Sequence, residues 1–302
     1  MKHYYRILMA AAISILAFAA CDQQNKKELY TPEQENEVSF AAGVYSDIEL
    51  PASTNTVSIT IARNSANGEI TVPLQTTLPS EIKCPESVTF AADAYETTVD
   101  LDITNMVNAD ATFKGTISIA DETYYNANTS PYPSISVTLK RQYNWESLGE
   151  GEFWDNMMTH PVIVKTEVLQ ATNAATKRFR IMNPFPNDVI EPFAVAQGGK
   201  VGGAKSEYIE FFHVDATSDL VSWTSPYYPG VSITVDGSEY GDVEGGYTKD
   251  YAKQCGLVME KVYQFYPYYS FSVGGSTYSW GKAYSAYLSL PGGPSLKELL
   301  EL

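Results

Sequence analysis

Short alternations of apolar and polar residues limit most strongly how this chain can fold. Residues 57–63 (VSITIAR) alternate with a period of two, as a strand with one buried face requires. Asn67-Gly68 follows and is typical of a tight hairpin turn, because both turn residues must adopt a positive φ. Residues 69–76 (EITVPLQT) supply the partner strand, in which Pro73 predicts an edge position or a bulge.

Strand-like segments of this kind continue along the whole chain. They cover residues 87–91, 97–103, 115–120, 134–139, 162–169, 177–182, 208–214, 231–235, 263–273 and 283–290. Residues 248–256 are the one ambiguous segment, in which we consider a short helix that ends at Gly256. Ser295 and Glu298 fit a capping box and predict a short C-terminal helix. We therefore predict an all-β protein with two β-sandwich-like domains in tandem and a short C-terminal helix.

The N-terminus has the pattern of an export signal. Lys2 and Arg6 precede an uncharged apolar run over residues 7–20, which is short for a bilayer span. Small residues lead into Cys21, and this arrangement resembles the lipoprotein box of bacteria, although Phe18 stands where such boxes more often carry Leu. The resemblance implies a signal peptide over residues 1–20 and a lipid on Cys21 that tethers the chain to a membrane. The alternative is plain secretion without a lipid.

Residues 21–37 are polar and charged, and we expect a flexible tether between the lipid and the first domain. Cleavage before Cys21 would remove Lys2 and Arg6 from the 20 basic residues. The mature chain would then hold 18 basic and 36 acidic residues, a formal charge of −18. Such a surface repels phosphate backbones, so we expect no nucleic-acid partner.

Two cysteines remain after Cys21. Cys84 and Cys255 are far apart in the sequence, and we favour two free thiols over a disulfide between domains. The chain contains no Cys-x-x-Cys motif, so we expect no structural zinc site.

Residues 38–142 resemble the Calx-beta family of immunoglobulin-like sandwiches. The resemblance rests on the opening strand at 38–40, Tyr45 with Glu49, the hairpin at 57–76, and the segments 88–93, 97–103, 115–119 and 135–139. Family members that bind calcium carry acidic residues after the strand near Asp102, where this chain has Thr-Asn-Met-Val at 104–107. The resemblance therefore implies a spacer or scaffold domain more than a calcium site.

Residues 143–302 form a second predicted domain. The pattern W-x-x-L-G-E-G-x-F-x-D at residues 145–155, followed by residues 178–185 (RFRIMNPF), resembles the second domain of tandem lipoproteins from glycan-foraging Gram-negative bacteria. The resemblance implies a run of antiparallel strands. It also implies an outer-membrane lipoprotein, at the cell surface or on the periplasmic face.

Two groups of carboxylates are candidates for glycoside hydrolysis, which needs an acid and a base or nucleophile around one sugar bond. The first group is Glu150, Glu152 and Asp155, and the second is Glu239, Asp242 and Glu244. Solvated turns explain both groups more simply. No nucleophile elbow, Walker loop, zinc-protease helix or dinucleotide fingerprint is present, so we expect no enzyme activity.

The second acidic group also lies in a Gly-rich loop that could offer oxygen ligands to calcium. Its members would be Asp236, Glu239, Asp242 and Glu244, although their spacing matches no standard calcium loop. We otherwise expect no cofactor.

Aromatic clusters of the second domain give the strongest indication of a ligand site. Residues 223–229 (WTSPYYP) form a proline-bounded loop that carries Trp223, Tyr227 and Tyr228, and Trp280 follows in a later strand. A flat ring can cover the apolar face of a sugar, so rings exposed on a loop suit glycan binding. The alternative is that rings such as those of residues 263–271 fill the core.

Three functions remain open at this stage. The first hypothesis is a membrane-anchored, non-catalytic binding protein for a glycan or another extracellular ligand. The second is a structural or adhesive surface component that makes protein contacts, and the third, less favoured, is a glycoside hydrolase.

Overall fold

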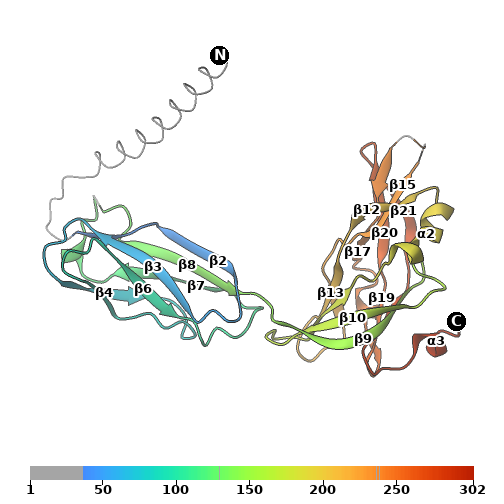
Figure 1. The fold of residues 1–302 in the computed structure, drawn as a ribbon, viewed down its shortest axis with the longest axis horizontal. Coiled ribbons are helices and arrows are strands. Elements are labelled where there is room, and N and C mark those ends of the chain that lie inside the picture. The colour runs from blue at the N-terminus through green and yellow to red at the C-terminus, as the bar shows by residue number, and fades with distance from the viewer. Residues whose placement is uncertain (1–36, 129, 236, 238) are drawn as a thin grey trace, which may run out of the picture. The chain divides into compact units, whose positions relative to one another are not determined.

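The computed structural model describes residues 37–302 except positions 129, 236 and 238 (Figure 1). The predicted signal peptide, Cys21 and the tether up to residue 36 lie outside the described residues. The chain divides into two compact units, of which the first extends to Val107 and resumes from Ala111 to Arg141. The second comprises Asn108–Asp110 and Gln142–Leu302. Strands dominate both units, which confirms the all-β prediction.

The first unit packs two sheets face to face. One sheet has the order β1-β3-β6, and the other has the order β2-β8-β7-β4-β5, in which β2 pairs parallel with β8. The strands are β1 Val38–Phe40, β2 Val44–Leu50, β3 Thr56–Arg63, β4 Ile70–Thr76, β5 Ser87–Phe90, β6 Glu96–Asp102, β7 Phe113–Ile119 and β8 Ser134–Arg141. Alternate residues such as Val57, Ile59 and Ile61 are buried between the sheets, as the period of two predicts.

Pro73 predicts an edge position or a bulge for strand β4, but β4 lies between β7 and β5 and neither pairing has a register shift. Its first half pairs with β5 and its second half pairs with β7, and Pro73 stands where the pairing changes sides. Pro73 accepts a hydrogen bond from the amide of Ala120, and its missing N–H falls where the pairing with β7 begins. Because each half of β4 pairs on one side only, the strand can hold a proline although it lies inside the sheet.

The second unit is built on one eight-stranded antiparallel sheet in the order β14-β13-β11-β10-β9-β22-β19-β18. These strands are β9 Trp145–Asp155, β10 Val164–Ala171, β11 Arg178–Met182, β13 Tyr208–His213, β14 Val221–Trp223, β18 Gly256–Met259, β19 Val262–Phe265 and β22 Ala286–Ser289.

The two edge strands of this sheet meet, so the sheet closes on itself. Leu220 and Gly256 form an antiparallel bridge, and the amide of Val221 donates to the carbonyl of Cys255. The amide of Leu257 donates to the carbonyl of Asp219. Closure leaves an inward face of alternate apolar residues along each strand and two ends at which the interior can open.

Two small sheets and a helix cover one end of the closed sheet. The sheets have the orders β12-β15-β16 and β17-β20-β21. Tyr227, in the loop that follows β14, forms an antiparallel bridge with Gly245 of β17. The elements are α2 Asn187–Ala196, β12 Lys200–Lys205, β15 Pro229–Thr234, β16 Tyr240–Asp242, β17 Glu244–Gly246, β20 Tyr268–Val273 and β21 Ser276–Ala283. Figure 1 shows α2, β12, β15, β20 and β21 gathered in the upper part of the second unit, above β9 and β10.

Helix α2 was not predicted, because its apolar stripe is narrow and Pro192 lies inside it. Ile190 and Ala194, four residues apart, supply the buried face. The ambiguous segment at 248–256 contains only one turn of 3-10 helix, Ala252–Gln254. The predicted C-terminal helix exists as α3, Leu296–Leu299, but the side chain of Ser295 makes no capping hydrogen bond.

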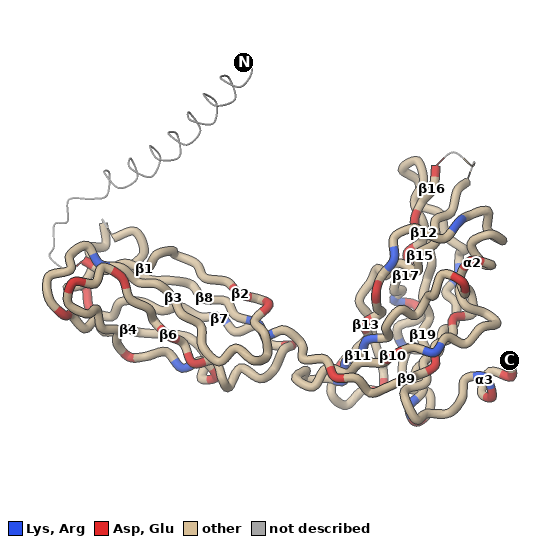
Figure 2. Tube along the Cα trace, viewed as in Figure 1, with Lys and Arg blue, Asp and Glu red and all other residues tan. Residues whose placement is uncertain are grey.

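Both remaining cysteines in the described residues are free thiols, as favoured from the sequence. Acidic and basic residues are interspersed along each unit (Figure 2). Between residues 37 and 302, leaving out the three undescribed positions, no helix is both long and apolar enough to cross a membrane.

Candidate functional site

The uncovered end of the closed sheet carries a pocket of about 410 Å³, which we call the mouth pocket. Its apolar wall consists of Leu148, Phe179, Leu257, Tyr263, Leu290 and Pro291. Its polar groups are Gln170, Lys177, Glu260 and Lys261. The lining comes from β9, β10, β11, β18, β19 and the segment after β22, so residues far apart in sequence meet here. Apolar walls with a few polar groups are typical of small-molecule sites, and this volume lies in their range of about 300–1,000 Å³.

A β-bulge places Leu148 at the rim. Val168 pairs with Gly149 and Leu169 pairs with Ser147, so Leu148 has no partner across the strand pair. Gly149 adopts a φ of 104°, which favours glycine. Leu148 is 40% exposed, which is unusual for leucine and leaves its side chain available at the pocket.

The second glycine of the L-G-E-G pattern fits the same strand closely against its neighbours. A Cβ on Gly151 would lie 2.6 Å from the carbonyl oxygen of Ser289 and 2.9 Å from a methyl of Val168. The pattern flagged in the sequence therefore builds one wall of the mouth pocket.

The floor of the pocket is fixed by a buried hydrogen-bond chain. His213 Nδ1 lies 2.7 Å from the carbonyl oxygen of Ser218 and must donate to it, so Nε2 accepts from the Tyr263 hydroxyl at 2.9 Å. Burial, with the nearby negative charge of Asp219, raises the pKa of Tyr263 to about 12. Tyr263 therefore remains a neutral, oriented part of the floor.

The covered end of the closed sheet is filled instead. Asp155, the last residue of β9, is fully buried and accepts two backbone hydrogen bonds at Oδ1, from Met157 and Met158. Tyr269 donates to its Oδ2 at 2.7 Å and lies 2.9 Å from the Tyr227 hydroxyl. Burial raises the pKa of Asp155 to about 6, although these hydrogen bonds oppose the shift.

Trp223 and Tyr227 belong to this filled end and not to an exposed shelf. Each is 5% exposed, so the expectation of exposed ligand-binding rings is wrong for both residues. Trp223 is the last residue of β14 and pairs with Phe211, which continues the inward alternation from Val221. The Tyr227 ring leaves no room for a Cβ on Gly245, whose ideal position is 2.3 Å from Tyr227 Cζ.

Tyr228 and Trp280 are half-buried and make separate contacts. The Tyr228 amide donates to Ser206 Oγ at 2.9 Å. Trp280 packs on Phe193 and Phe271, and its Nε1 donates to Gln197 Oε1 at 3.1 Å. Among the described residues no ring contact joins Tyr228 to Trp280, so the four predicted rings do not form one surface.

The described members of the predicted calcium site, Glu239, Asp242 and Glu244, do not form a metal-binding group. Asp236 lies outside the described residues, and Glu239 is exposed. Asp242 accepts from Ser232 Oγ at 2.6 Å, and Glu244 accepts from Ser270 Oγ at 3.2 Å. Within the part of the chain that is described, no group of three or more His, Cys, Asp or Glu side chains could hold a metal ion.

The carboxylates of β9 lie on opposite faces of the strand. Glu150 points outward to Lys165 at 3.1 Å, and Glu152 accepts from the Leu296 amide at 2.7 Å. Asp155 is enclosed with Tyr269 in the core. The alternation of a strand separates the two outward carboxylates from Asp155, so these three side chains do not face one substrate position.

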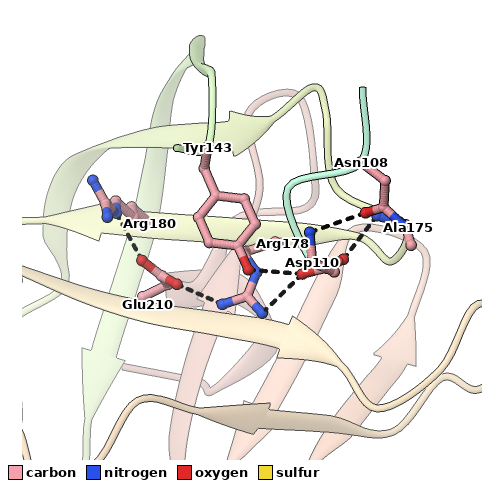
Figure 3. Close-up of polar contacts among 7 residues, drawn as sticks. All are labelled: Asn108, Asp110, Tyr143, Ala175, Arg178, Arg180 and Glu210. Atoms are coloured by element: carbon pink, nitrogen blue, oxygen red, sulfur yellow. Dashed lines mark hydrogen bonds and ion pairs between the residues drawn. The ribbon is translucent and has the colours of Figure 1, made fainter. Parts of the chain in front are cut away.

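An arginine–aromatic cluster stabilises the outer face of the closed sheet (Figure 3). Glu210 accepts from Arg178 at 2.5 Å and from Arg180 at 2.9 Å, and Arg178 also contacts Asp110 at 3.5 Å. The two guanidinium groups lie over four rings, those of Tyr143 and Phe212 for Arg178 and those of Trp145 and Tyr208 for Arg180.

Asp110 completes this cluster from the segment Asn108–Asp110 of the same unit. Burial alone would raise its pKa, but hydrogen bonds from Tyr143 and the Ala175 amide, together with the charge of Arg178, hold the pKa of Asp110 below its ordinary value. Each charge in the cluster has a partner, so it is a closed network and not an open binding surface. This cluster was not predicted from the sequence, although the R-F-R alternation at 178–180 places both arginines on one face of the strand.

No protein-family model matches this chain, and no curated protein is similar to it. Solved structures with similarity include CBD12 from CALX1.2, at 8% identity and a TM-score of 0.32, over 48% of this chain and 79% of that one. The apo form of the Calx CBD1 domain aligns at 9% identity and a TM-score of 0.26, over 35% of this chain and 96% of that one. A candidate carbohydrate-binding protein from Bacteroides ovatus ATCC 8483 aligns at 9% identity and a TM-score of 0.32, over 83% of this chain and 74% of that one.

Proposed function

We propose that this protein is an exported, non-catalytic binding protein whose second unit takes an extracellular glycan into the mouth pocket. The observation that carries the proposal is the contrast within the closed sheet: one end is filled by packed side chains, and the other holds an open pocket of about 410 Å³. Function concentrates at irregular ends of a rigid scaffold, because loops and strand ends can vary while the sheet holds them in place.

The chemistry of the pocket suits a sugar. A sugar ring presents an apolar face of C–H groups and a rim of hydroxyls. Leu148, Leu257 and Pro291 can cover the first, and Gln170 and Glu260 can exchange hydrogen bonds with the second. This assignment replaces the rings of Trp223 and Tyr227 as the basis for glycan binding, because a buried ring cannot stack on a ligand.

The proposal places the chain on a membrane through a lipid on Cys21, in the outer membrane at the cell surface or on its periplasmic face. The support is the pattern of residues 1–21 alone. In this arrangement the first unit is a spacer that carries the second. Metabolic labelling with a palmitate analogue, followed by Cys21→Ser, tests the anchor: labelling of wild type and its loss in the variant are expected.

A glycan array probed with the full chain tests the ligand class. We expect binding that is lost when the pocket is filled by Leu257→Trp, with the circular dichroism spectrum unchanged. Val258→Trp is the matched control, because Val258 is the neighbouring residue, is 48% exposed and does not line the pocket. Equal binding by both variants would contradict the assignment to the mouth pocket.

A structural or adhesive role is the second candidate, and an exposed edge strand favours it. In the part of the chain that the structure describes, strand β2 pairs only with β8, and Val44 and Ile48 on it are 67% and 57% exposed. Such an edge can recruit a strand from a partner. Co-purification of a surface protein that is lost with Ile48→Lys and unaffected by Leu257→Trp would favour this role over glycan binding.

A further inference from the structure

The polar groups of the mouth pocket are unequal in charge. Lys177 and Lys261 bring two ammonium groups, and Glu260 brings one carboxylate. Among the described residues neither lysine forms an ion pair, whereas Lys83 and Lys165 each contact a carboxylate. Among the side chains that line the pocket, two ammonium groups therefore stand against one carboxylate, in a chain with a formal charge of −16. Asp219 adds a negative charge near Tyr263 on the floor, away from the lining.

Lys261 is held in place at the rim. It lies in the turn between β18 and β19 with a φ of 63°, and its Nζ donates to the carbonyl oxygens of Pro291 at 3.3 Å and Gly292 at 3.4 Å. An ammonium group has three N–H bonds, so one remains for a ligand. The two carbonyl groups orient the ammonium without neutralising its charge.

Lys177 contributes from the opposite wall. It directly precedes β11, and its carbonyl accepts from the His213 amide at 2.9 Å, which fixes the backbone from which its side chain extends. Its side chain is exposed and remains hydrated until a ligand arrives. Two cations on separate walls favour an anion placed between them, and a charge-assisted hydrogen bond is roughly twice as strong as a neutral one.

We infer that the mouth pocket selects a ligand that carries a carboxylate beside an apolar surface. This ligand is an acidic saccharide that contains uronic-acid residues. Lys177 and Lys261 bind the carboxylate, and the wall of Leu148, Leu257 and Pro291 covers the C–H face of the ring. This inference rests on the proposed function and deepens it. Glu260 opposes the anion, so binding also depends on the contacts that the apolar wall makes with the ligand.

Titration calorimetry on the full chain tests the inference with three probes. They are a galacturonic-acid trimer, the same trimer with its carboxyls methyl-esterified, and decanoate. We expect the acidic trimer to bind and its ester to bind about tenfold or more weakly, the range of hydrogen bonds to charged groups. Lys177→Gln and Lys261→Gln should each weaken the acidic trimer and leave the ester unchanged.

Matched variants separate charge from fold. Lys261→Arg keeps the charge and should keep most of the affinity, and Lys165→Gln changes a lysine on the outer face and should have no effect. Glu260→Gln should strengthen binding of the acidic trimer, because a like charge is removed. Equal affinity for the acid and its ester, or lysine variants that bind the acid like wild type, would overturn the inference.

The remaining outcomes distinguish this inference from the proposed function. Binding of decanoate but not of the trimer, with the same dependence on the two lysines, supports carboxylate selection and overturns the saccharide form and the glycan function. Binding of neutral glycans on the array, with none of the three probes bound, overturns the carboxylate inference and leaves the proposed function standing.

Discussion

The two ends of the closed sheet in the second unit use the same strands for opposite purposes. Strand β9 carries Leu148 at the mouth pocket and Asp155 in the core, which are about 23 Å apart at the rise of a strand. At the Asp155 end, two tyrosines and a tryptophan occupy the interior. At the Leu148 end, the rings of Phe179 and Tyr263 lie among aliphatic and long polar or charged side chains, and a pocket remains.

This difference shows that ring content alone does not identify a binding surface. A tryptophan or tyrosine buries about 150–250 Å² of surface, so large rings are the efficient way to fill a closed sheet. Shorter side chains and a bulge at the other end leave space unfilled. The most aromatic part of the unit is therefore its stabilising end, and we place ligand binding at the less aromatic one.

The largest effect is expected at the filled end, from Trp223→Ala. Removing this 5% exposed ring should lower the free energy of unfolding of the second unit by about 3–5 kcal/mol, measured by urea denaturation. Below its melting temperature the variant should keep ligand affinity in the mouth pocket. Loss of affinity in a folded variant would break the separation of the two ends.

A smaller effect with a distinctive pH dependence is expected from Asp155→Asn. The ordinary carboxyl pKa of 3.8 applies to the unfolded chain, and burial raises it to about 6 in the folded protein. As pH rises from about 4 to 6, the unfolded chain loses this proton first, so wild-type stability should fall by about 3 kcal/mol across this window.

Asparagine removes this titration and retains an acceptor for the two backbone amides. The melting temperature of Asp155→Asn should therefore fall less between pH 4 and pH 7 than that of wild type. Carboxyls with a lowered pKa, such as Asp110, act with the opposite sign and below the ordinary value of 3.8, outside this window. Parallel curves for the two proteins would contradict the burial of a titrating Asp155.

Tyr269→Phe sharpens the comparison by removing one hydroxyl. Asp155 Oδ2 loses its donor, and a buried group left without a partner costs about 1–3 kcal/mol. Tyr268→Phe is the control, since this neighbouring ring is half-buried and its hydroxyl contacts Ser279 on the exposed strand β21. Thermal unfolding should separate the two variants, and equal melting temperatures would argue against the buried chain.

The smallest effect on stability is expected at the open end, from Leu148→Ala. Leu148 is 40% exposed and unpaired in its bulge, so the free energy of unfolding should fall by less than about 1 kcal/mol. The melting temperature should therefore change little. Ligand affinity should nevertheless fall, because this side chain supplies part of the wall. A large loss of stability without loss of affinity would mean that Leu148 only packs the core.

The sequence predicted the strands because alternation is local. In residues 57–63 and 178–182 the alternation shows directly which side chains are buried. Both segments form strands in which those side chains face the core. Closure of the sheet was not predictable from such patterns, since it depends on the meeting of Leu220 and Gly256, 36 positions apart. The alternation in residues 221–223 is compatible with a strand in which Val221 and Trp223 both face inward. Pro226 and Pro229 follow closely, and they led to the prediction of a turn with exposed rings.

The mouth pocket was missed for a related reason. Lys177 and Lys261 look like ordinary solvated residues in the sequence, and only the antiparallel order of β11, β10, β9, β22, β19 and β18 brings their strand ends together. Gly149 and Gly151 were the available signal. Two glycines within one strand indicate a bulge or a close approach of backbones, and both occur here beside the pocket.

Amide chemical-shift mapping with the galacturonic-acid trimer tests the central claim most directly. If the ligand enters the open end, the largest shifts will belong to Leu148, Lys177, Leu257 and Lys261, and the amides around Asp155 and Tyr227 will remain unchanged. Shifts centred on Tyr227, Tyr228 and Trp280 with none at the lysines would contradict the claim and return binding to the aromatic end.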